Sequence, residues 1–135
     1  MNDTKTREPI QGFNEFFDAY KECALWASHR DDDGDEFNFD GLTIYDFSEQ
    51  SEQILRAHAL SYYSQVHYYL NRDEDATPHA GSPAAQLGHD FWLDQNGYGT
   101  GATAGHWPRY GTVYEEVAEG YPSLYPVRMG GEVTI

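Results

Sequence analysis

Residues 82–99 read SPAAQLGHDFWLDQNGYG and carry both a start signal and a stop signal for an α-helix. Ser82 is a preferred N-cap residue, and Pro83 is favoured at the first helical position, where its missing N–H would have no partner in any case. Asn96 and Gly97 are residue types that commonly end a helix. The apolar anchors of the segment are Leu87, Phe91 and Trp92. We therefore predict a helix that begins at Pro83 and ends near Asn96.

A second helix is predicted on the N-terminal side, after a polar lead at residues 1–10 that we expect to be flexible. Apolar residues there recur three and four positions apart, as on the buried face of a helix. These residues are Phe13, Phe16, Phe17, Tyr20, Ala24 and Ala27. Leu25 and Trp26 are expected to widen the buried face. The helix should end near residues 28–30, because the acidic run that follows repels itself and contains the turn-forming Gly34.

Between these helices the pattern predicts another one, with Ser48 as its N-cap and an end near Leu70. Its apolar residues recur at the same spacing: Leu55, Ala59, Tyr62, Val66 and Tyr69. The preceding residues, 37–47, alternate between polar and apolar types around Gly41, which fits either a short strand or an ordered loop. A charged linker rich in Gly and Pro follows the helix.

The last third of the chain contains a glycine-rich irregular segment, a short helix and a hairpin. Thr112 and Glu115 have the spacing of a capping box, which predicts a fourth helix that begins at Thr112 with Val113 and Val117 on its inner face. The tail reads as a β-hairpin around Gly130-Gly131, with Pro126 confining its strand to an edge. Expected elements thus continue to the C-terminus.

These patterns together predict a mainly α fold of the α+β type. Three to four helices should pack around an aromatic core and be followed by a small C-terminal β-hairpin. The chain of 135 residues has the length of one domain, so residues 11–135 are expected to form a single compact unit. Aromatic residues make up 16% of the chain, and each one buries a large area. They can therefore form a core despite the low content of aliphatic residues.

Charge is the strongest indication of a partner. The chain has 23 acidic and 8 basic residues, a formal net charge of -15, and residues 31–52 contain no Lys or Arg. Nine acids lie in that segment: Asp31, Asp32, Asp33, Asp35, Glu36, Asp40, Asp46, Glu49 and Glu52. Such a field repels nucleic acids and anionic membranes and attracts basic surfaces, so we expect these nine residues to contact a basic protein. Adaptation to a salty cytoplasm would give the same composition.

Two binding motifs that the sequence resembles are excluded by their spacing or by the elements around them. The acidic segment does not match a calcium-binding loop in either register, with Gly34 or Gly41 at the sixth position. The string from Gly99 to Ala104 matches a dinucleotide fingerprint, but no strand leads into it and no helix follows. We expect no cofactor and no metal. The single Cys23 should be buried, and without a signal peptide or an apolar membrane span the protein should be soluble and cytoplasmic.

His89, Asp90 and His106, with Asp94, are candidates for an acid–base cluster, because carboxylates orient imidazoles and tune their pKa. Adjacent residues of a helix point about 100° apart, so His89 and Asp90 are not expected to pair with each other. If the protein were an enzyme or a ligand-binding module, its site would centre on His89, Asp90, Trp92 and Asn96, with the glycine-rich segment as a mobile lid. The catalytic residues of such an enzyme would be His89, Asp90 and Asn96, although we favour a binding protein without catalytic residues.

Two segments, FFDAYKECALWAS at 16–28 and PAAQLGHDFWLDQNGYGTG at 83–101, resemble a family of small acidic proteins of unknown function encoded by phages and plasmids. The family signature is Gly-His-Asp-Phe-Trp-Leu-x-x-Asn-Gly. Signature residues present here include Gly88, His89, Asp90, Trp92, Asn96, Gly97 and Gly99.

Three departures from the family pattern stand out. Asp94-Gln95 replaces Thr-Arg, Tyr98 replaces a second His, and residues 101–106 lengthen the approach to Trp107. Either this chain has lost a chemistry, or the signature is structural. The resemblance implies a mobile-element accessory protein, which together with the charge suggests an inhibitor that mimics nucleic acid and binds a basic host or defence protein.

Overall fold

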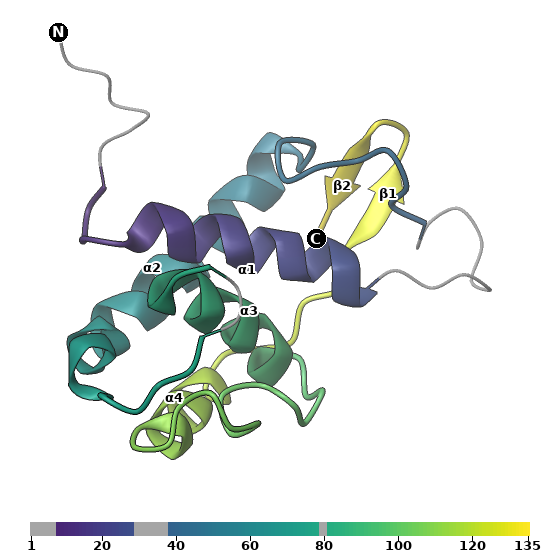
Figure 1. Ribbon diagram of the computed structural model, residues 1–135. Helices are drawn as coiled ribbons and strands as arrows, with labels where there is room; N and C mark the ends of the chain where they lie inside the picture. Colours follow the sequence, from purple (N-terminus) through teal and green to yellow (C-terminus); the bar gives the residue numbers. More distant parts are fainter. Residues whose placement is uncertain (1–7, 29–37, 79–80) are drawn as a thin grey trace, which may run out of the picture.

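A computed structural model describes residues 8–28, 38–78 and 81–135 (Figure 1). The predicted mainly α class is confirmed. The elements are α1 (Phe13–Ser28), α2 (Glu49–Val66), the 3₁₀ helix η2 (His67–Arg72), α3 (Pro83–Gln95), α4 (Gly111–Ala118), β1 (Val127–Met129) and β2 (Glu132–Thr134). Five of the nine predicted acidic contact residues, Asp31, Asp32, Asp33, Asp35 and Glu36, lie outside the described residues.

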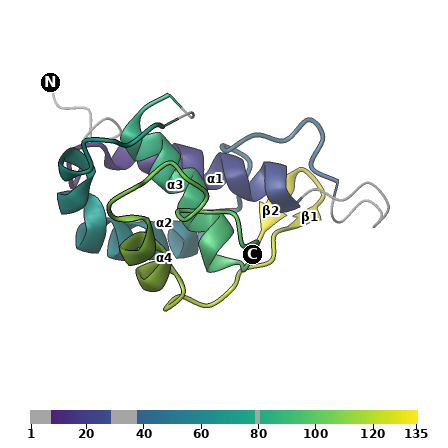
Figure 2. The ribbon, with the colours of Figure 1, turned by 60° about the horizontal axis from the view of Figure 1, so that its bottom comes forward.

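Helix α3 lies between α1 and α4 in both views of the ribbon (Figures 1 and 2). Its predicted caps are present, because the Ser82 hydroxyl accepts the Ala85 N–H and Pro83 opens the helix. At Gly88 the backbones of α1 and α3 approach so closely that an added Cβ would overlap the carbonyl oxygen of Phe16. The position therefore requires glycine, because any side chain would push the two helices apart.

Aromatic rings from α1, α2 and α3 form the core, as the sequence predicts. Tyr62 and Phe91 stack with ring centroids 3.9 Å apart and an interplanar angle of 4°, and Phe16 lies against both rings. Tyr20 stacks on Phe91 and donates its hydroxyl to Gln95 Oε1 at 2.6 Å. Burial raises the pKa of the Tyr20 and Tyr62 hydroxyls well above the ordinary value. These phenols therefore stay neutral in the core.

Helix α2 begins as predicted, with the Ser48 hydroxyl accepting the Ser51 N–H, but its α-helical part ends at Val66 and continues as η2. Residues 38–47 form a loop with a single parallel bridge between Phe47 and Val133. The guanidinium of Arg128 donates to the carbonyl oxygens of Asn38 and Asp40, which fixes the start of this loop on the hairpin. The ordered loop, one of the two predicted alternatives, is therefore the one that forms.

The predicted C-terminal hairpin is confirmed. Strands β1 and β2 pair antiparallel, with Arg128 opposite Val133, and Gly130 has a φ of 64° in the turn. Val133 is buried and also bonds to the backbone of Asp46 and Ser48, so the hairpin is joined to the start of α2. None of the helices in the described part of the chain has the length and hydropathy that a membrane span requires.

The predicted start of α4 was wrong. The helix begins at Gly111, one residue earlier, with no side-chain cap, and Thr112 lies exposed inside it. The Asp73 carboxylate, far away in the sequence, accepts the backbone N–H groups of Arg109 and Tyr110 and so fixes the chain just before the helix.

The predicted inner face of α4 was wrong in part, because Val117 packs against the core but Val113 does not. Tyr114 and Ala118 are the buried residues, whereas Val113 is exposed and Val117 is only half-buried. Glu115, the expected second member of the capping box, instead accepts a hydrogen bond from the Thr103 hydroxyl. The helix is rotated relative to the prediction because its tertiary contacts, rather than a local cap, set its start.

Candidate functional site

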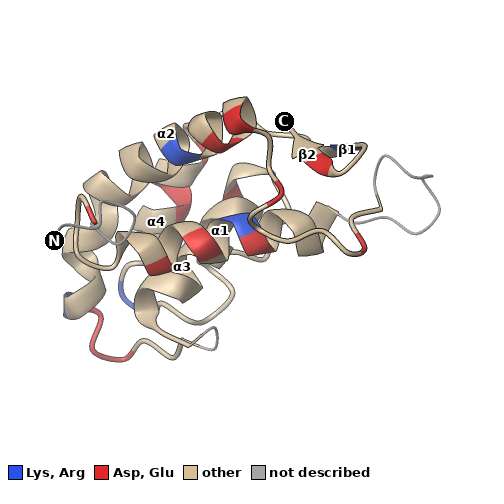
Figure 3. Cartoon of the chain, turned by 90° about the horizontal axis from the view of Figure 1, so that it is seen from above, with Lys and Arg blue, Asp and Glu red and all other residues tan. Residues whose placement is uncertain are grey.

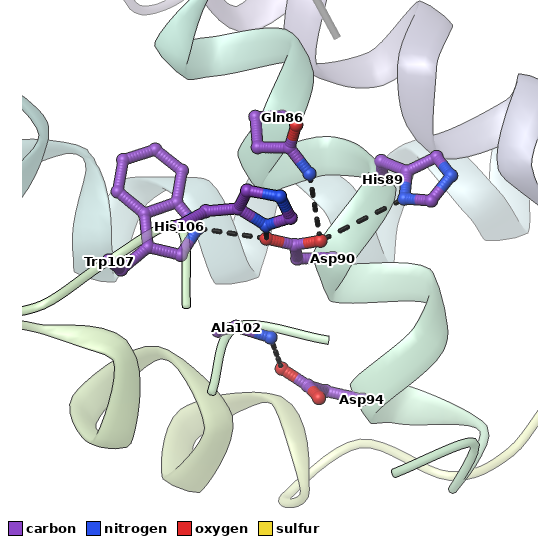
Figure 4. Close-up of polar contacts among 7 residues, drawn as sticks. All are labelled: Gln86, His89, Asp90, Asp94, Ala102, His106 and Trp107. Carbon is purple, nitrogen blue, oxygen red and sulfur yellow. Dashed lines mark hydrogen bonds and ion pairs between the residues drawn. The ribbon is translucent and has the colours of Figure 1, made fainter. Parts of the chain in front are cut away.

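Asp90 is the centre of a polar cluster on α3, and only 1% of its surface is exposed (Figure 4). Its Oδ1 accepts a hydrogen bond from Gln86 Nε2 at 3.0 Å, and its Oδ2 accepts one from Trp107 Nε1 at 2.8 Å. Each oxygen also faces an imidazole, because the Nδ1 atoms of His89 and His106 lie 3.8 Å from Oδ1 and Oδ2 respectively. One buried carboxylate thus gathers four nitrogen-bearing side chains.

His89 and Asp90 come close to each other but form no hydrogen bond, because His89 Nδ1 lies 3.8 Å from Asp90 Oδ1 and has no hydrogen-bond partner. The rotation of 100° per residue sets the directions of the two Cα–Cβ bonds, but the imidazole reaches back over the helix toward the carboxylate (Figure 4). His106 arrives from the loop between α3 and α4. The structure therefore brings together three of the four residues predicted for an acid–base cluster.

The fourth residue, Asp94, holds the glycine-rich segment. Its Oδ2 accepts the Ala102 backbone N–H at 2.9 Å, and an added Cβ at Gly101 would overlap its carboxylate. Burial raises the pKa of Asp94 to about 6, against the lowering effect of the Ala102 hydrogen bond, and the charges of Glu115 and Asp90 raise it further. This carboxyl acts as an anchor for residues 101–102.

The other signature residues have structural positions. Trp92 is fully buried. Asn96 ends α3 by donating its amide to the Trp92 carbonyl at 2.9 Å and accepting the Leu124 N–H at 2.7 Å. Gly97 and Gly99 have φ values of 75° and 76°, which glycine adopts without strain. Of the residues predicted for an enzyme site, His89 and Asp90 come together, whereas Trp92 and Asn96 lie in the packing and the helix end.

A second feature lies at the end of α1, where Trp26 is 70% exposed. The expectation that Trp26 widens the buried face of α1 was wrong. Its position in the sequence could have shown this, because it falls between the three-and-four steps of the buried stripe. The other two tryptophans of the chain, Trp92 and Trp107, are 0% and 3% exposed. Trp26 also borders more than one hollow of the surface.

A groove of about 860 Å³ lies between α1 and the loop at residues 38–45, and we call it the Trp26 groove. Two aromatic side chains border it, Trp26 and the 84% exposed Tyr45. Three acidic residues line it: Asp18, Glu22 and Asp40. All three are exposed, and burial partway into the surface raises the pKa of Asp18, against the lowering effect of Lys21.

Only part of the predicted acidic contact surface reaches this groove. Asp40 lines it, whereas Asp46 accepts hydrogen bonds from Thr43 and shapes the loop. Glu52 pairs with Lys21 at 3.0 Å, and Glu49 is exposed in the first turn of α2. Seen from above, acidic positions lie along both α1 and α2, each with a basic position among them (Figure 3).

Three residues of these features were not predicted from the sequence: Asp18 and Glu22 in the groove, and Trp107 beside Asp90. Asp18 and Glu22 precede the acidic run, and their helical spacing toward Trp26 was the available signal. Trp107 as the partner of Asp90 had no local signal, because 17 residues separate the two positions. Cys23 is buried as predicted, and burial raises the pKa of its thiol, which keeps the thiol neutral.

Comparisons with protein-family models, with curated proteins and with solved structures found no match to this chain. The resemblance to the phage and plasmid family therefore stays a prediction. Among the residues that the structure describes, no group of three or more His, Cys, Asp or Glu side chains could hold a metal ion.

Proposed function

We propose that the protein is a non-enzymatic binding protein that engages a basic protein partner through the Trp26 groove. The observation that carries the proposal is the pairing of two exposed aromatic side chains, Trp26 and Tyr45, with the three carboxylates of one groove. In this proposal the chain is a phage or plasmid accessory product that acts in the host cytoplasm. Its target is a basic host or defence protein, whose nucleic-acid-binding residues the acidic side chains engage.

Charge and shape support a basic occupant. The net charge of -15 accelerates the approach of cationic surfaces. Within the groove, a Lys or Arg side chain can place its cation over the Trp26 ring while pairing with a carboxylate such as Glu22, one helical turn earlier. Lys21, the neighbouring cation on α1, pairs with Glu52 outside the groove. Its charge also acts on Asp18, where it opposes the effect of burial on the pKa.

The apolar part of the groove supports a protein rather than an isolated ion as the occupant. Leu25, Leu42 and Ile44 line it beside the aromatic side chains. Protein interfaces combine an apolar centre with a polar rim, and Trp and Tyr are the residues that most often dominate their binding energy. A basic segment with interspersed apolar residues therefore fits this groove best.

Trp26 provides a direct test, because it is the one tryptophan that a neutral quencher such as acrylamide can reach in the folded chain. We expect a short peptide of alternating Arg and Leu to protect Trp26 from quenching, and a peptide of alternating Glu and Leu to give no protection. The triple change Asp18→Asn, Glu22→Gln and Asp40→Asn should weaken peptide binding by about tenfold or more.

The matched control removes the same number of charges from exposed acids outside the groove. It combines Glu74→Gln, Asp75→Asn and Glu119→Gln. This triple variant should bind the Arg-Leu peptide within about twofold of the unchanged protein. Equal weakening by both triple variants would reject the groove and leave the acidic charge as general salt adaptation.

A further inference from the structure

A separate cavity of about 490 Å³ lies over Asp90, on the side of Trp26 where α1 meets α3 and the glycine-rich loop. Trp26, His89, Tyr98 and His106 supply its ring-bearing walls, and Leu93 adds an apolar surface. The Tyr98 hydroxyl donates to the Ala27 carbonyl at 3.1 Å, so the loop is attached to the end of α1. The volume suits a small organic molecule.

The charge at the base of this cavity is negative. Asp90 accepts two hydrogen bonds from neutral N–H groups, which stabilise its ionised form without cancelling its charge. In the described part of the chain, the basic side chains within 4 Å of its oxygens are the two imidazoles, His89 and His106, and not Lys or Arg. A buried carboxylate without a permanent cation favours a positive charge nearby. An anionic ligand would be opposed by this carboxylate and by the net charge.

His89 connects the carboxylate to the cavity. Its Nδ1 is buried and faces Asp90, while the second ring nitrogen points away from the carboxylate (Figure 4). At 3.8 Å this contact is longer than a hydrogen bond, so the carboxylate acts on the ring only through its charge, which favours hydrogen on the nearer nitrogen, Nδ1, and a lone pair on Nε2. His89 can therefore accept a hydrogen bond from a ligand N–H group.

The walls select a flat cation. Trp26 is 70% exposed and Tyr98 is 45% exposed, and both line the cavity. The Trp26 ring also lies near the His89 ring, with ring centroids 5.7 Å apart. Aromatic faces attract cations, and a planar guanidinium or amidinium can stack on them while its edge donates hydrogen bonds. A tetrahedral ammonium ion has no flat face, so it cannot stack on a ring and donate hydrogen bonds from its edge at the same time.

We propose that this cavity binds a planar organic cation, with an amidinium or guanidinium group stacked on Trp26 and Tyr98 and donating a hydrogen bond to His89. This site goes beyond the proposed protein binding and does not depend on it. Trp26 borders both hollows, but the groove carboxylates and Tyr45 are not among the cavity residues. The ligand is a small molecule that carries a planar cationic group.

A probe series of equal ring size tests the chemistry. Benzamidine carries a planar cation, benzamide is its neutral counterpart, benzylamine carries a tetrahedral cation, and benzoate is an anion. We expect benzamidine to shift the NMR signals of the Trp26 indole and the His89 ring in a saturable way. Benzylamine and benzamide should bind at least about tenfold more weakly, and benzoate should cause no shift.

Variants locate the site. His89→Phe keeps a ring in the wall but removes the acceptor, and Tyr98→Leu removes an aromatic face, so each should weaken benzamidine binding by about tenfold. Both side chains are partly exposed, and thermal unfolding of each variant verifies that the fold is retained. Tyr45→Ala, a groove variant, should leave benzamidine binding unchanged.

Three results would overturn the proposal. Equal binding of benzamide and benzamidine would show an apolar pocket without charge selection. Saturable binding of benzoate would show that the imidazoles are protonated and form an anion site. Benzamidine binding that is insensitive to both His89→Phe and Tyr98→Leu would place the cation elsewhere. A failure of the Arg-Leu peptide to protect Trp26 would reject the protein-binding proposal alone.

Discussion

The helix α3 segment, residues 82–99, and the Trp26 groove use similar residue types for opposite purposes. In α3, the Asp90 carboxylate is buried and takes hydrogen bonds from Gln86 and Trp107. In the groove, carboxylates such as Glu22 are exposed beside an exposed tryptophan. The buried α3 carboxylates are held by partners within the fold, whereas the groove presents its carboxylates and Trp26 to the solvent.

The physical basis of this difference is desolvation. A buried carboxylate is tolerated only when donors replace the water it has lost, so Asp90 and Asp94 each have fixed partners. A carboxylate in water needs no such partner, and it stays available for a cation that arrives from outside. Removal of the buried Asp90 carboxylate should therefore reduce the free energy of unfolding, while removal of an exposed groove carboxylate should leave it nearly unchanged.

The largest expected effect is that of Asp90→Ala. The change leaves the buried N–H groups of Trp107 and Gln86 without their carboxylate acceptor, which should lower the free energy of unfolding by about 3–4 kcal/mol. Urea titration followed by tryptophan fluorescence measures the loss. Asp90→Asn keeps one acceptor oxygen and should lose less. A cost below about 0.5 kcal/mol for the alanine variant would mean that Asp90 does not hold the loop.

Gly88→Ala should have the next largest effect. The added methyl group overlaps the Phe16 carbonyl, so α1 and α3 must separate, at a cost of about 2–3 kcal/mol. Gly131→Ala is the matched control, because an added Cβ there meets nothing within 4 Å. Thermal and urea unfolding of the two variants compare the positions. Equal stability of both variants would contradict the close contact between the helices.

Asp94→Asn tests the pH dependence of the α3 segment. The pKa of Asp94 is raised from 3.8 to about 6 in the folded state, mainly by burial. Its contribution to stability is therefore complete below pH 3.8 and is lost as the pH rises through about 6. The amide cannot ionise and can still accept the Ala102 N–H.

We expect Asp94→Asn to gain about 1 kcal/mol relative to the unchanged protein between about pH 4 and pH 8. Urea titrations at both pH values measure this difference. Glu116→Gln, at an exposed position of α4, is the control that should show no such trend. A constant difference between the Asp94→Asn variant and the unchanged protein across this range would show that the carboxyl ionises without cost.

Substitutions of the groove carboxylates should have the smallest effect on the free energy of unfolding. Glu22→Gln should change the free energy of unfolding by no more than about 0.5 kcal/mol, because the side chain is exposed. Asp18→Asn should be neutral or slightly stabilising, since burial raises the pKa of this carboxyl and the charge therefore carries a cost. Urea unfolding is again the measurement. A loss above about 1 kcal/mol for either variant would give the groove a structural role like that of α3.

Much of the fold was predictable because its signals are local. Ser82, Pro83 and Asn96 act within one helical turn of their own positions, so their types and spacing were sufficient to bound α3. The same holds for Ser48 at α2. The start of α4 was not predictable in this way, because Asp73 holds the chain before it from a distant part of the sequence.

The candidate sites were less predictable than the fold. The sequence pointed to His89 and Asp90 but not to their approach within 3.8 Å, since periodicity describes the directions of Cβ atoms and not the reach of side chains. It placed Trp26 in the core, although its position lies off the buried stripe of α1. The acidic run drew attention to residues 31–52, whereas two of the three groove carboxylates, Asp18 and Glu22, precede that run.

The sequence by itself determined the helices, the aromatic core, the hairpin and the strong negative charge, because these depend on spacing over a few residues and on composition. The tertiary structure alone decided that Gly88 lies against Phe16, that Trp107 completes the buried site of Asp90, and that Trp26 stands exposed between a groove and a cavity. Contacts between residues far apart in the chain depend on how the helices pack, and no local pattern records them.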